Sequence, residues 1–193
     1  MDAERLRRTI ASAKRGQADG YAALLEAYGP RLYGYFLRAT GRHHDAEDLL
    51  SELTLRLVRR LKSYDERGRF DQWVFRIAAN MVRDRIRRLR SGPGTLSLSW
   101  QDESQGSLGE QLPADGPAVD AAALAEEASA GVQQALGKLD DMTRQMVLLR
   151  YFGELSFKEL AELFQCPLGT ALARVHRGLG VLRKEMKAED ALD

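Results

Sequence analysis

Residues 156–183 read SFKELAELFQCPLGTALARVHRGLGVLR, and this stretch indicates what kind of fold the chain has. Ser156 is placed to cap a first helix, and Glu159 is placed to reach back and complete a capping box. Gln165 and Cys166 form a tight corner. Pro167 suits the first position of a second helix, because proline lacks the backbone N–H that would be left unpaired there. The pattern therefore predicts two helices that cross at an angle.

The second of these helices has an apolar side and a side suited to a partner. Its apolar residues recur at helical spacing and are expected to face inward: Leu168, Leu172, Val175, Leu179 and Leu182. The residues left for a partner are small, polar or cationic: Thr170, Ala173, Arg174, His176, Arg177 and Lys184. Such side chains suit a major groove lined by phosphates. We interpret the stretch as a DNA-binding helix-turn-helix, with an ordinary helical hairpin as the alternative.

The composition is that of a helix-rich protein without a membrane segment. The chain has 193 residues, of which 44% are hydrophobic, and five prolines. No apolar run approaches the length that spans a membrane, and residues 1–16 lack the apolar core of a signal peptide. We expect a cytoplasmic protein that does not insert into membranes. The single cysteine, Cys166, excludes an internal disulfide and a cysteine-based zinc site.

The net charge of +1 conceals an uneven distribution of charge along the chain. Residues 1–90 contain 20 Lys and Arg against 12 Asp and Glu. Residues 91–130 contain seven acids and no Lys or Arg, and residues 166–187 contain five bases and one acid. The distribution predicts two cationic surfaces separated by an anionic connector.

The spacing of apolar residues predicts helices over most of the chain. From residue 21 to 90 these residues keep helical period, with interruptions at Gly41 and at 65–68, and the last helix would begin near Asp71. Residues 91–117 are rich in Gly, Ser, Pro and acids, as flexible linkers are. Further helices are expected near 120–136 and 141–152. The predicted fold is all-α, with two small helical domains joined by a flexible acidic linker.

A second group of residues suited to nucleic acid surrounds the helix expected from Asp71. We call it the aromatic-cationic set: Lys62, Tyr64, Arg69, Phe70, Trp73, Arg76, Asn80, Arg83 and Arg87. Aromatics interleaved with cations suit unstacked single-stranded bases better than intact duplex DNA. Core aromatics and arginines at a helix C-terminus would produce the same pattern. The helix-turn-helix makes nucleic-acid binding the better interpretation.

Three carboxylates form a separate acidic face. Asp45, Asp48 and Glu52 fall at helical spacing, directly after His43 and His44. A metal-dependent nuclease would need such carboxylates, but metal sites draw ligands from several elements, and the sequence offers no second ligand set. A solvated or partner-facing helix surface is the better interpretation. We expect no metal, no cofactor and no catalytic motif.

Three stretches together resemble a known family. They are DAEDLLSELTLRL at 45–57, FDQWVFRIAANMVRDRIRR at 70–88 and ALGKLDDMTRQMVLLRYFGELSFKELAELFQCPLGT at 135–170. In this order, with an acidic linker before the third, they resemble the extracytoplasmic-function (ECF) RNA polymerase sigma factors of the sigma-70 family. The resemblance covers nearly everything from Tyr21 to Lys187. It implies a non-enzymatic subunit that directs bacterial core RNA polymerase to promoters.

The resemblance also implies a division of the chain. Residues 1–20 would be an N-terminal helical extension, 21–90 region 2, 91–128 the acidic linker and 129–187 region 4. Region 2 would bind core polymerase and would recognise and melt the minus-10 element, capturing a flipped base of the non-template strand. Region 4 would read the minus-35 element in duplex DNA. An anti-sigma factor is a further implied partner.

The resemblance assigns residues to these tasks by position. The polymerase-docking set would lie on the clamp helices of the largest subunit: Asp45, Glu47, Asp48, Leu49, Glu52 and Leu53. The aromatic-cationic set matches the part that acts on the minus-10 element. The minus-35 set matches the recognition helix and its approach: Ser156, Thr170, Ala173, Arg174, His176 and Arg177.

Two places depart from the family pattern. The family usually has Leu-Pro where this chain has Leu139-Asp140, and Val followed by Lys or Arg where it has Ala171-Leu172. The second departure removes a cation near the DNA, so a minus-35 preference cannot be carried over by analogy. An autonomous helix-turn-helix regulator is the alternative function. It would need a dimer interface and would have little use for the loop at 62–73.

Overall fold

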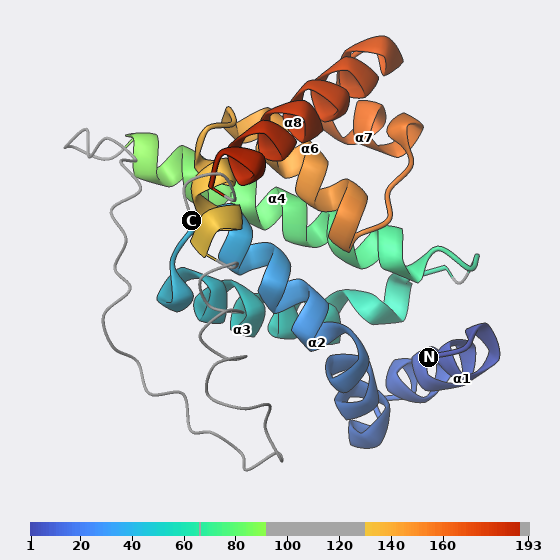
Figure 1. Ribbon diagram of the computed structural model, residues 1–193. Helices are drawn as coiled ribbons and strands as arrows, with labels where there is room; N and C mark the ends of the chain where they lie inside the picture. Colours follow the sequence, from blue (N-terminus) through green and yellow to red (C-terminus); the bar gives the residue numbers. More distant parts are fainter. Residues whose placement is uncertain (66, 92–129, 190–193) are drawn as a thin grey trace.

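The computed structural model describes residues 1–65, 67–91 and 130–189, and every regular element in these ranges is helical (Figure 1). The elements are α1 (Ala3–Lys14), α2 (Ala18–Thr40), α3 (His43–Arg60), the 3-10 helix η1 (Leu61–Ser63), α4 (Phe70–Ser91), α6 (Asp141–Phe152), α7 (Phe157–Phe164) and α8 (Leu168–Glu189). Residues 130–137 are also helical. The predicted all-α fold is confirmed. Residues 92–128 of the predicted linker, and 120–129 of a predicted helix, lie outside the described residues.

Local signals explain where several helices begin and end. Asp2 caps α1 by accepting a hydrogen bond from the backbone N–H of Arg5 at 2.7 Å. Gly41 ends α2 with a φ of 74°, a left-handed conformation that glycine adopts without steric cost. The predicted capping box of α7 is present, because the Glu159 carboxylate accepts from the Ser156 backbone N–H at 2.9 Å. The helix-turn-helix therefore begins where the sequence predicts.

Helices α1 to α4 form an N-terminal unit around large buried side chains. Leu32, Tyr35, Phe36, Leu53 and Phe75 are all completely buried at its centre. A T-shaped contact between Tyr35 and Phe75, with ring centroids 5.9 Å apart, joins α2 to α4. Helices α2 and α4 can then present their outer faces without exposing the core.

Helices α6, α7 and α8 form a C-terminal unit with α6 at its centre. Seven consecutive residues of α6, from Thr143 to Leu149, are buried. A helix buried on all sides must have neighbours on all sides. Helix α6 packs against α7 and α8 on one side and against α2 and α4 on the other. In Figure 1 it lies between α8 and the N-terminal unit.

The two units are in direct contact. The Arg31 guanidinium of α2 donates to the Phe152 carbonyl oxygen at the end of α6, at 2.6 Å, and to the Asp71 carboxylate of α4, at 2.8 Å. A Cβ on Gly34 would lie 3.0 Å from the Phe152 ring, and a Cβ on Gly153 would lie 2.9 Å from that of Phe75. Glycine at these two positions therefore permits the close approach of the units.

The orientation of α8 corrects one expectation. Leu168, Leu172 and Leu179 were expected to face inward, but they are 51%, 38% and 45% exposed. Val175 is buried as expected and Leu182 is half-buried, but the residues that complete the inner row are Ala171 and Gly178. A Cβ on Gly178 would lie 2.9 Å from the side chains of Thr143 and Val147 on α6. Packing through small residues brings the two helices closer than leucines would allow, and this rotates the leucines outward.

None of the helices in the described ranges is both long and apolar enough to cross a membrane.

Candidate nucleic-acid interface

One face of α4 carries five members of the aromatic-cationic set. Trp73, Arg76, Asn80, Arg83 and Arg87 are spaced by three and four residues, so they line one side of the helix. Asn80 and Arg87 are exposed, and the other three are half-buried. On the opposite side of α4, Val74, Phe75, Ala78 and Val82 are completely buried. The structure therefore gathers these residues into one cationic stripe that faces away from the core.

The aromatic members of the set form a cluster where α4 begins. The ring centroids of Tyr64 and Trp73 are 4.7 Å apart, and those of Tyr64 and Phe70 are 5.4 Å apart. Tyr64 is only 6% exposed and Phe70 only 1%, whereas Trp73 is half-buried. Of the three rings, only Trp73 reaches the surface appreciably. Tyr64 and Phe70 support the loop from inside, and Lys62 and Arg69 are exposed on it.

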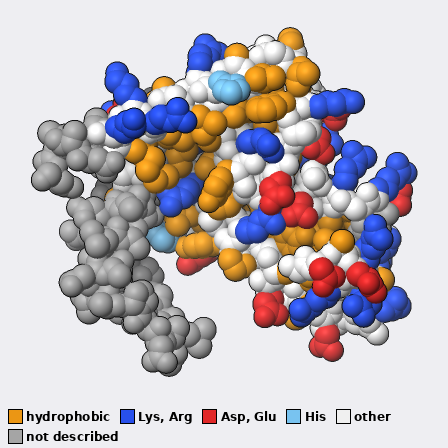
Figure 2. Space-filling model, turned by 45° about the vertical axis from the view of Figure 1, so that its right-hand side comes forward, with side chains coloured by type: hydrophobic (Ala, Val, Ile, Leu, Met, Phe, Trp, Pro, Cys, Tyr) orange, Lys and Arg blue, Asp and Glu red, His pale blue; other side chains and the backbone are white. Residues whose placement is uncertain are grey.

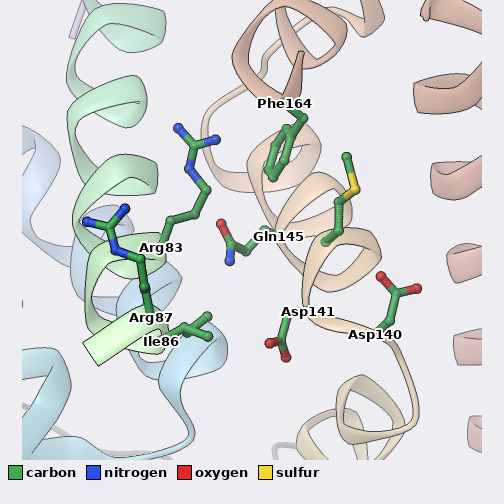
Figure 3. A pocket seen from close by; sticks show the side chains of 8 residues that line it. Arg83, Ile86, Arg87, Asp140, Asp141, Gln145 and Phe164 are labelled. Atoms are coloured by element: carbon green, nitrogen blue, oxygen red, sulfur yellow. The ribbon is translucent and has the colours of Figure 1, made fainter. Parts of the chain in front are cut away.

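The C-terminal part of the stripe on α4 borders a groove between the two units (Figure 3). Arg83 donates to the Leu163 carbonyl oxygen at the end of α7, at 3.1 Å, and its guanidinium lies 5.4 Å from the centre of the Phe164 ring. The groove has a volume of about 460 Å³, with Arg83 and Arg87 on one wall and Asp140 and Asp141 on the other. The packing of the units thus covers part of the Arg83 side chain.

The polymerase-docking set divides between two faces of α3. Asp45, Leu49 and Leu53 are buried, and the Asp45 carboxylate pairs with Arg85 of α4. The remaining members, Glu47, Asp48 and Glu52, point outward or lie at the edge. Only the second group is available to a partner in this conformation.

Two exposed apolar residues of α3 were missed by the sequence analysis. Leu55 is 59% exposed and Val58 is 44% exposed, and they share the outer face with Asp48 and Ser51. The spacing of Asp48, Ser51, Leu55 and Val58 is that of one helix face. From the sequence alone, these two apolar residues could equally belong to the core. The structure shows that they lie outside the buried row of α3.

The carboxylates of the acidic face do not converge on one point. Asp45 pairs with Arg85, Asp48 lies 3.7 Å from His44, and Glu52 accepts from Arg56 at 2.5 Å. Within the described residues, no group of three or more His, Cys, Asp or Glu is arranged to hold a metal ion. The geometry gives no support to the alternative of a metal-dependent nuclease.

The outer face of α8 carries most of the minus-35 set. Ala173, His176 and Arg177 are exposed, and Thr170 is half-buried. The His176 ring stacks on Phe157 of α7, with centroids 6.4 Å apart and planes inclined by 16°. Figure 2 shows Lys and Arg among exposed hydrophobic side chains on the part of the molecule where α7 and α8 lie. Ser156 is exposed and caps α7.

Arg174 differs from the other members of the minus-35 set. Its guanidinium donates to both carboxylate oxygens of Asp140, at 3.0 and 3.1 Å, and to the Thr143 hydroxyl at 3.0 Å. Partial burial raises the pKa of Asp140, but hydrogen bonds from Thr143 and the charge of Arg174 outweigh it and hold the pKa below its ordinary value. Asp140 also caps α6, so one carboxylate joins the start of α6 to α8.

Comparison with known proteins explains why two units of this kind occur in one chain. The family model described as sigma-70 region 2 matches residues 24–92, and the model described as sigma-70 region 4 matches residues 129–182. The ECF RNA polymerase sigma factor SigW of Bacillus subtilis is 32% identical over 186 residues, which cover 94% of this chain and 97% of that protein. This chain belongs to the ECF sigma factors of the sigma-70 family.

Other sigma factors share the similarity. The RNA polymerase sigma-H factor of Pseudomonas aeruginosa is 24% identical over 178 residues, covering 92% of each chain. The solved structure of CnrH with the cytosolic domain of CnrY matches with a TM-score of 0.63 at 24% identity, over 97% of this chain and 99% of CnrH. The sigma factor RpoE with the anti-sigma factor NepR, from Bartonella quintana, matches with a TM-score of 0.60 at 21% identity, over 86% of this chain and 96% of RpoE. At these identities the two structures show the fold alone.

As an ECF sigma factor, the chain is a transcription initiation factor and not an enzyme. It binds bacterial core RNA polymerase and directs promoter-specific initiation, and the autonomous regulator is not favoured. Region 2 corresponds to most of the N-terminal unit, and region 4 corresponds to the C-terminal unit.

Proposed function

We propose that this sigma factor uses three separate surfaces: the outer face of α3 for core polymerase, the stripe on α4 for the minus-10 element, and the outer face of α8 for the minus-35 element. The observation that carries the proposal is the position of the α4 stripe. Its amide and guanidinium groups line one side of a helix whose other side is buried along its middle, from Val74 to Val82. A cationic row held on a rigid helix suits a DNA backbone, because it matches a row of phosphates.

In the minus-10 surface, the exposed and the buried aromatics have different tasks. Trp73 is half-buried beside Arg76 and is placed to stack on an extruded base. Tyr64 and Phe70 hold the Trp73 ring from inside. Lys62 and Arg69 are exposed at the start of the surface and would contact phosphates. Stacking of a captured base offsets the few kcal/mol that its removal from the duplex costs.

In the polymerase-docking surface, exposed apolar side chains lie among acids. Leu55 and Val58 would supply the apolar centre, and Glu47 and Asp48 would pair with cations of the clamp helices. Asp45, Leu49 and Leu53 hold α3 against the N-terminal unit from inside. In the docking set inferred from the family, the exposed residues would thus contact the polymerase, and the buried residues would hold α3 in place.

A regulatory partner is part of the proposal. The solved structure of the similar sigma factor RpoE contains the anti-sigma factor NepR. We infer that an anti-sigma factor also binds this chain, and that the chain acts in the cytoplasm, where its polymerase partner is found.

The proposal is tested by footprinting holoenzyme, made from core polymerase and the full-length chain, on a promoter that it selects. Arg177→Ala removes an exposed cation of α8 and should reduce protection of the upstream element only. Asn80→Ala removes an exposed side chain of α4 and should reduce permanganate reactivity of melted thymines near the start site. Asp48→Lys should weaken assembly with core polymerase and leave helicity unchanged.

Two results would contradict the proposal. Equal loss of upstream and downstream signals for Arg177→Ala would show that the surfaces do not act separately. Unchanged assembly for Asp48→Lys would exclude the outer face of α3 as the docking surface.

A further inference from the structure

Two acceptor groups contact the Arg174 guanidinium on the inner side of α8. The Asp140 carboxylate accepts through both oxygens at 3.0 and 3.1 Å, and the Thr143 hydroxyl lies at 3.0 Å. The Arg174 Nε is buried and makes no hydrogen bond. The Arg174 side chain is 28% exposed, less than half the 61% of the Asp140 side chain. Arg174 is therefore directed at α6 and not at the outer face of α8.

Gly178, one turn further along α8, faces the same neighbour. A Cβ at this position would lie 2.9 Å from the Thr143 and Val147 side chains, so α8 touches α6 here without a side chain between them. Thr143 contacts both places, because its hydroxyl bonds Arg174 and its methyl group lies against Gly178. Two contacts one turn apart on the same side of a helix fix its rotation about its own axis.

The rotation of α8 decides which residues face outward. Val175 is buried between Arg174 and the exposed His176, and Arg177 follows on the exposed side. The Arg177 guanidinium bonds only its own helix in the described structure, at the Ala173 carbonyl oxygen, 3.4 Å away. If α8 rotated about its axis, Ala173, His176 and Arg177 would all change their orientation toward the base edges at once.

We propose that Arg174 and Asp140 form a positioning pair, which sets the rotation of α8 in the helix-turn-helix and makes no contact with DNA. This inference rests on the proposed reading of the minus-35 element by α8. The sequence pattern groups Arg174 with the DNA-facing cations, whereas the geometry separates it from them. The phosphate contacts of this helix come from Arg177 and the exposed Arg183 and Lys184.

The pair is tested with holoenzyme made from the full-length chain and a minus-35 duplex selected by wild-type holoenzyme from a random pool. Affinity is measured over a series of salt concentrations for Arg174→Gln, Asp140→Ser and the double variant. Serine at 140 keeps the helix cap and removes the carboxylate. Arg177→Gln is the matched control, because it removes an equivalent charge from the outer face.

We expect Arg177→Gln to reduce the magnitude of the salt slope by about 0.9 for one lost phosphate contact. Arg174→Gln and Asp140→Ser should each weaken binding several-fold, leave the slope unchanged and relax the base preference of the element. The double variant should have the same DNA affinity as whichever single variant binds less tightly, because both substitutions break the same contact. Thermal unfolding of each variant verifies that it is folded.

Three results would overturn the inference. The first is a reduced salt slope for Arg174→Gln, which would make Arg174 a phosphate contact. The second is tighter binding and a steeper slope for Asp140→Ser, which would show that Asp140 withholds Arg174 from DNA. The third is wild-type binding and wild-type base preference for both single variants. If wild-type holoenzyme selects no sequence at all, the proposed function fails instead, so the two failures are distinct.

Discussion

At the scale of single residues, α3 shows how one run of acids can serve two purposes. Asp45 is 4% exposed and pairs with Arg85 of α4, whereas Asp48, one turn later, is exposed. The two carboxylates are equivalent in the sequence pattern, because both lie in the docking set. Burial separates them, since a buried charge needs a partner and an exposed one does not.

Asp45→Ala should therefore destabilise the fold, and Asp48→Ala should not. Removal of the Asp45 carboxylate leaves the Arg85 guanidinium unpaired, and because Arg85 is 33% exposed we expect a loss of about 1–3 kcal/mol in the free energy of unfolding. Asp48→Ala should change it by less than about 0.5 kcal/mol. Urea denaturation of both variants measures the difference. Equal stabilities would contradict the structural role of Asp45.

Asp140 should make stability depend on acid pH. Its pKa is held below the ordinary value of 3.8, so its contribution is complete above that value and is lost as the pH falls through the folded-state pKa. Asp140→Asn keeps the cap of α6 but cannot ionise. The stability difference between wild type and this variant, measured by denaturation at neutral pH and below pH 3.8, should shrink in acid. A difference that is the same at both pH values would contradict the shift.

At the scale of elements, the sequence predicts helix ends better than helix faces. The capping box at Ser156 and Glu159 depends on residues three apart in the chain, and it forms as predicted. The inner face of α8 depends on which side α6 approaches, which local spacing does not encode. Leucines at 168, 172 and 179 fit an apolar stripe, yet Gly178 and Ala171 let the helices come closest.

The same limit applies to the candidate sites. The five members of the aromatic-cationic set on one face of α4 were predictable as a group, because their spacing is helical. Which rings would be buried was not predictable, because the positions of Tyr64 and Phe70 depend on α2 as well, through the contact of Phe70 with Tyr28 at 5.1 Å. The pairing of Arg174 with Asp140, residues 34 positions apart, likewise needs the folded chain.

Two glycines of α8 provide a direct test of its packing. Gly178→Ala places a methyl group 2.9 Å from two side chains of α6, and Gly180→Ala meets nothing within 4 Å. Both substitutions should gain about 1 kcal/mol of stability from helix propensity. Only Gly178→Ala should also lose stability through overpacking, by about 1–3 kcal/mol. Thermal denaturation should rank Gly180→Ala above Gly178→Ala by that difference. The reverse ranking would place another face of α8 against α6.

At the scale of the whole molecule, the two units share one packed core, and one arginine of α2 connects that helix to both α4 and α6. Arg31 of α2 bonds the Asp71 carboxylate and the Phe152 carbonyl oxygen, and its guanidinium lies 5.4 Å from the Phe75 ring. The Glu154 carboxylate is 3.5 Å away. Since Arg83 of the α4 stripe also bonds α7, this packing partly covers the surface proposed for the minus-10 element.

Arg31→Ala should loosen the contact between the units. It removes a charge-assisted hydrogen bond between them, which contributes about 1.5 kcal/mol at a partly exposed position. Small-angle X-ray scattering of the full-length chain should then give a larger radius of gyration. Arg56→Ala is the control, because its partner Glu52 lies on the same helix. An unchanged radius for Arg31→Ala would show that the Arg31 hydrogen bonds are not needed to hold the units together.

This chain directs core polymerase to promoters, and we propose that it does so through two separate DNA surfaces. The most direct test is run-off transcription by bacterial core RNA polymerase on a pool of genomic promoter fragments, with and without the protein. We expect new start sites preceded by two motifs at a constant spacing. The absence of new start sites, with duplex binding by the folded protein alone, would contradict it.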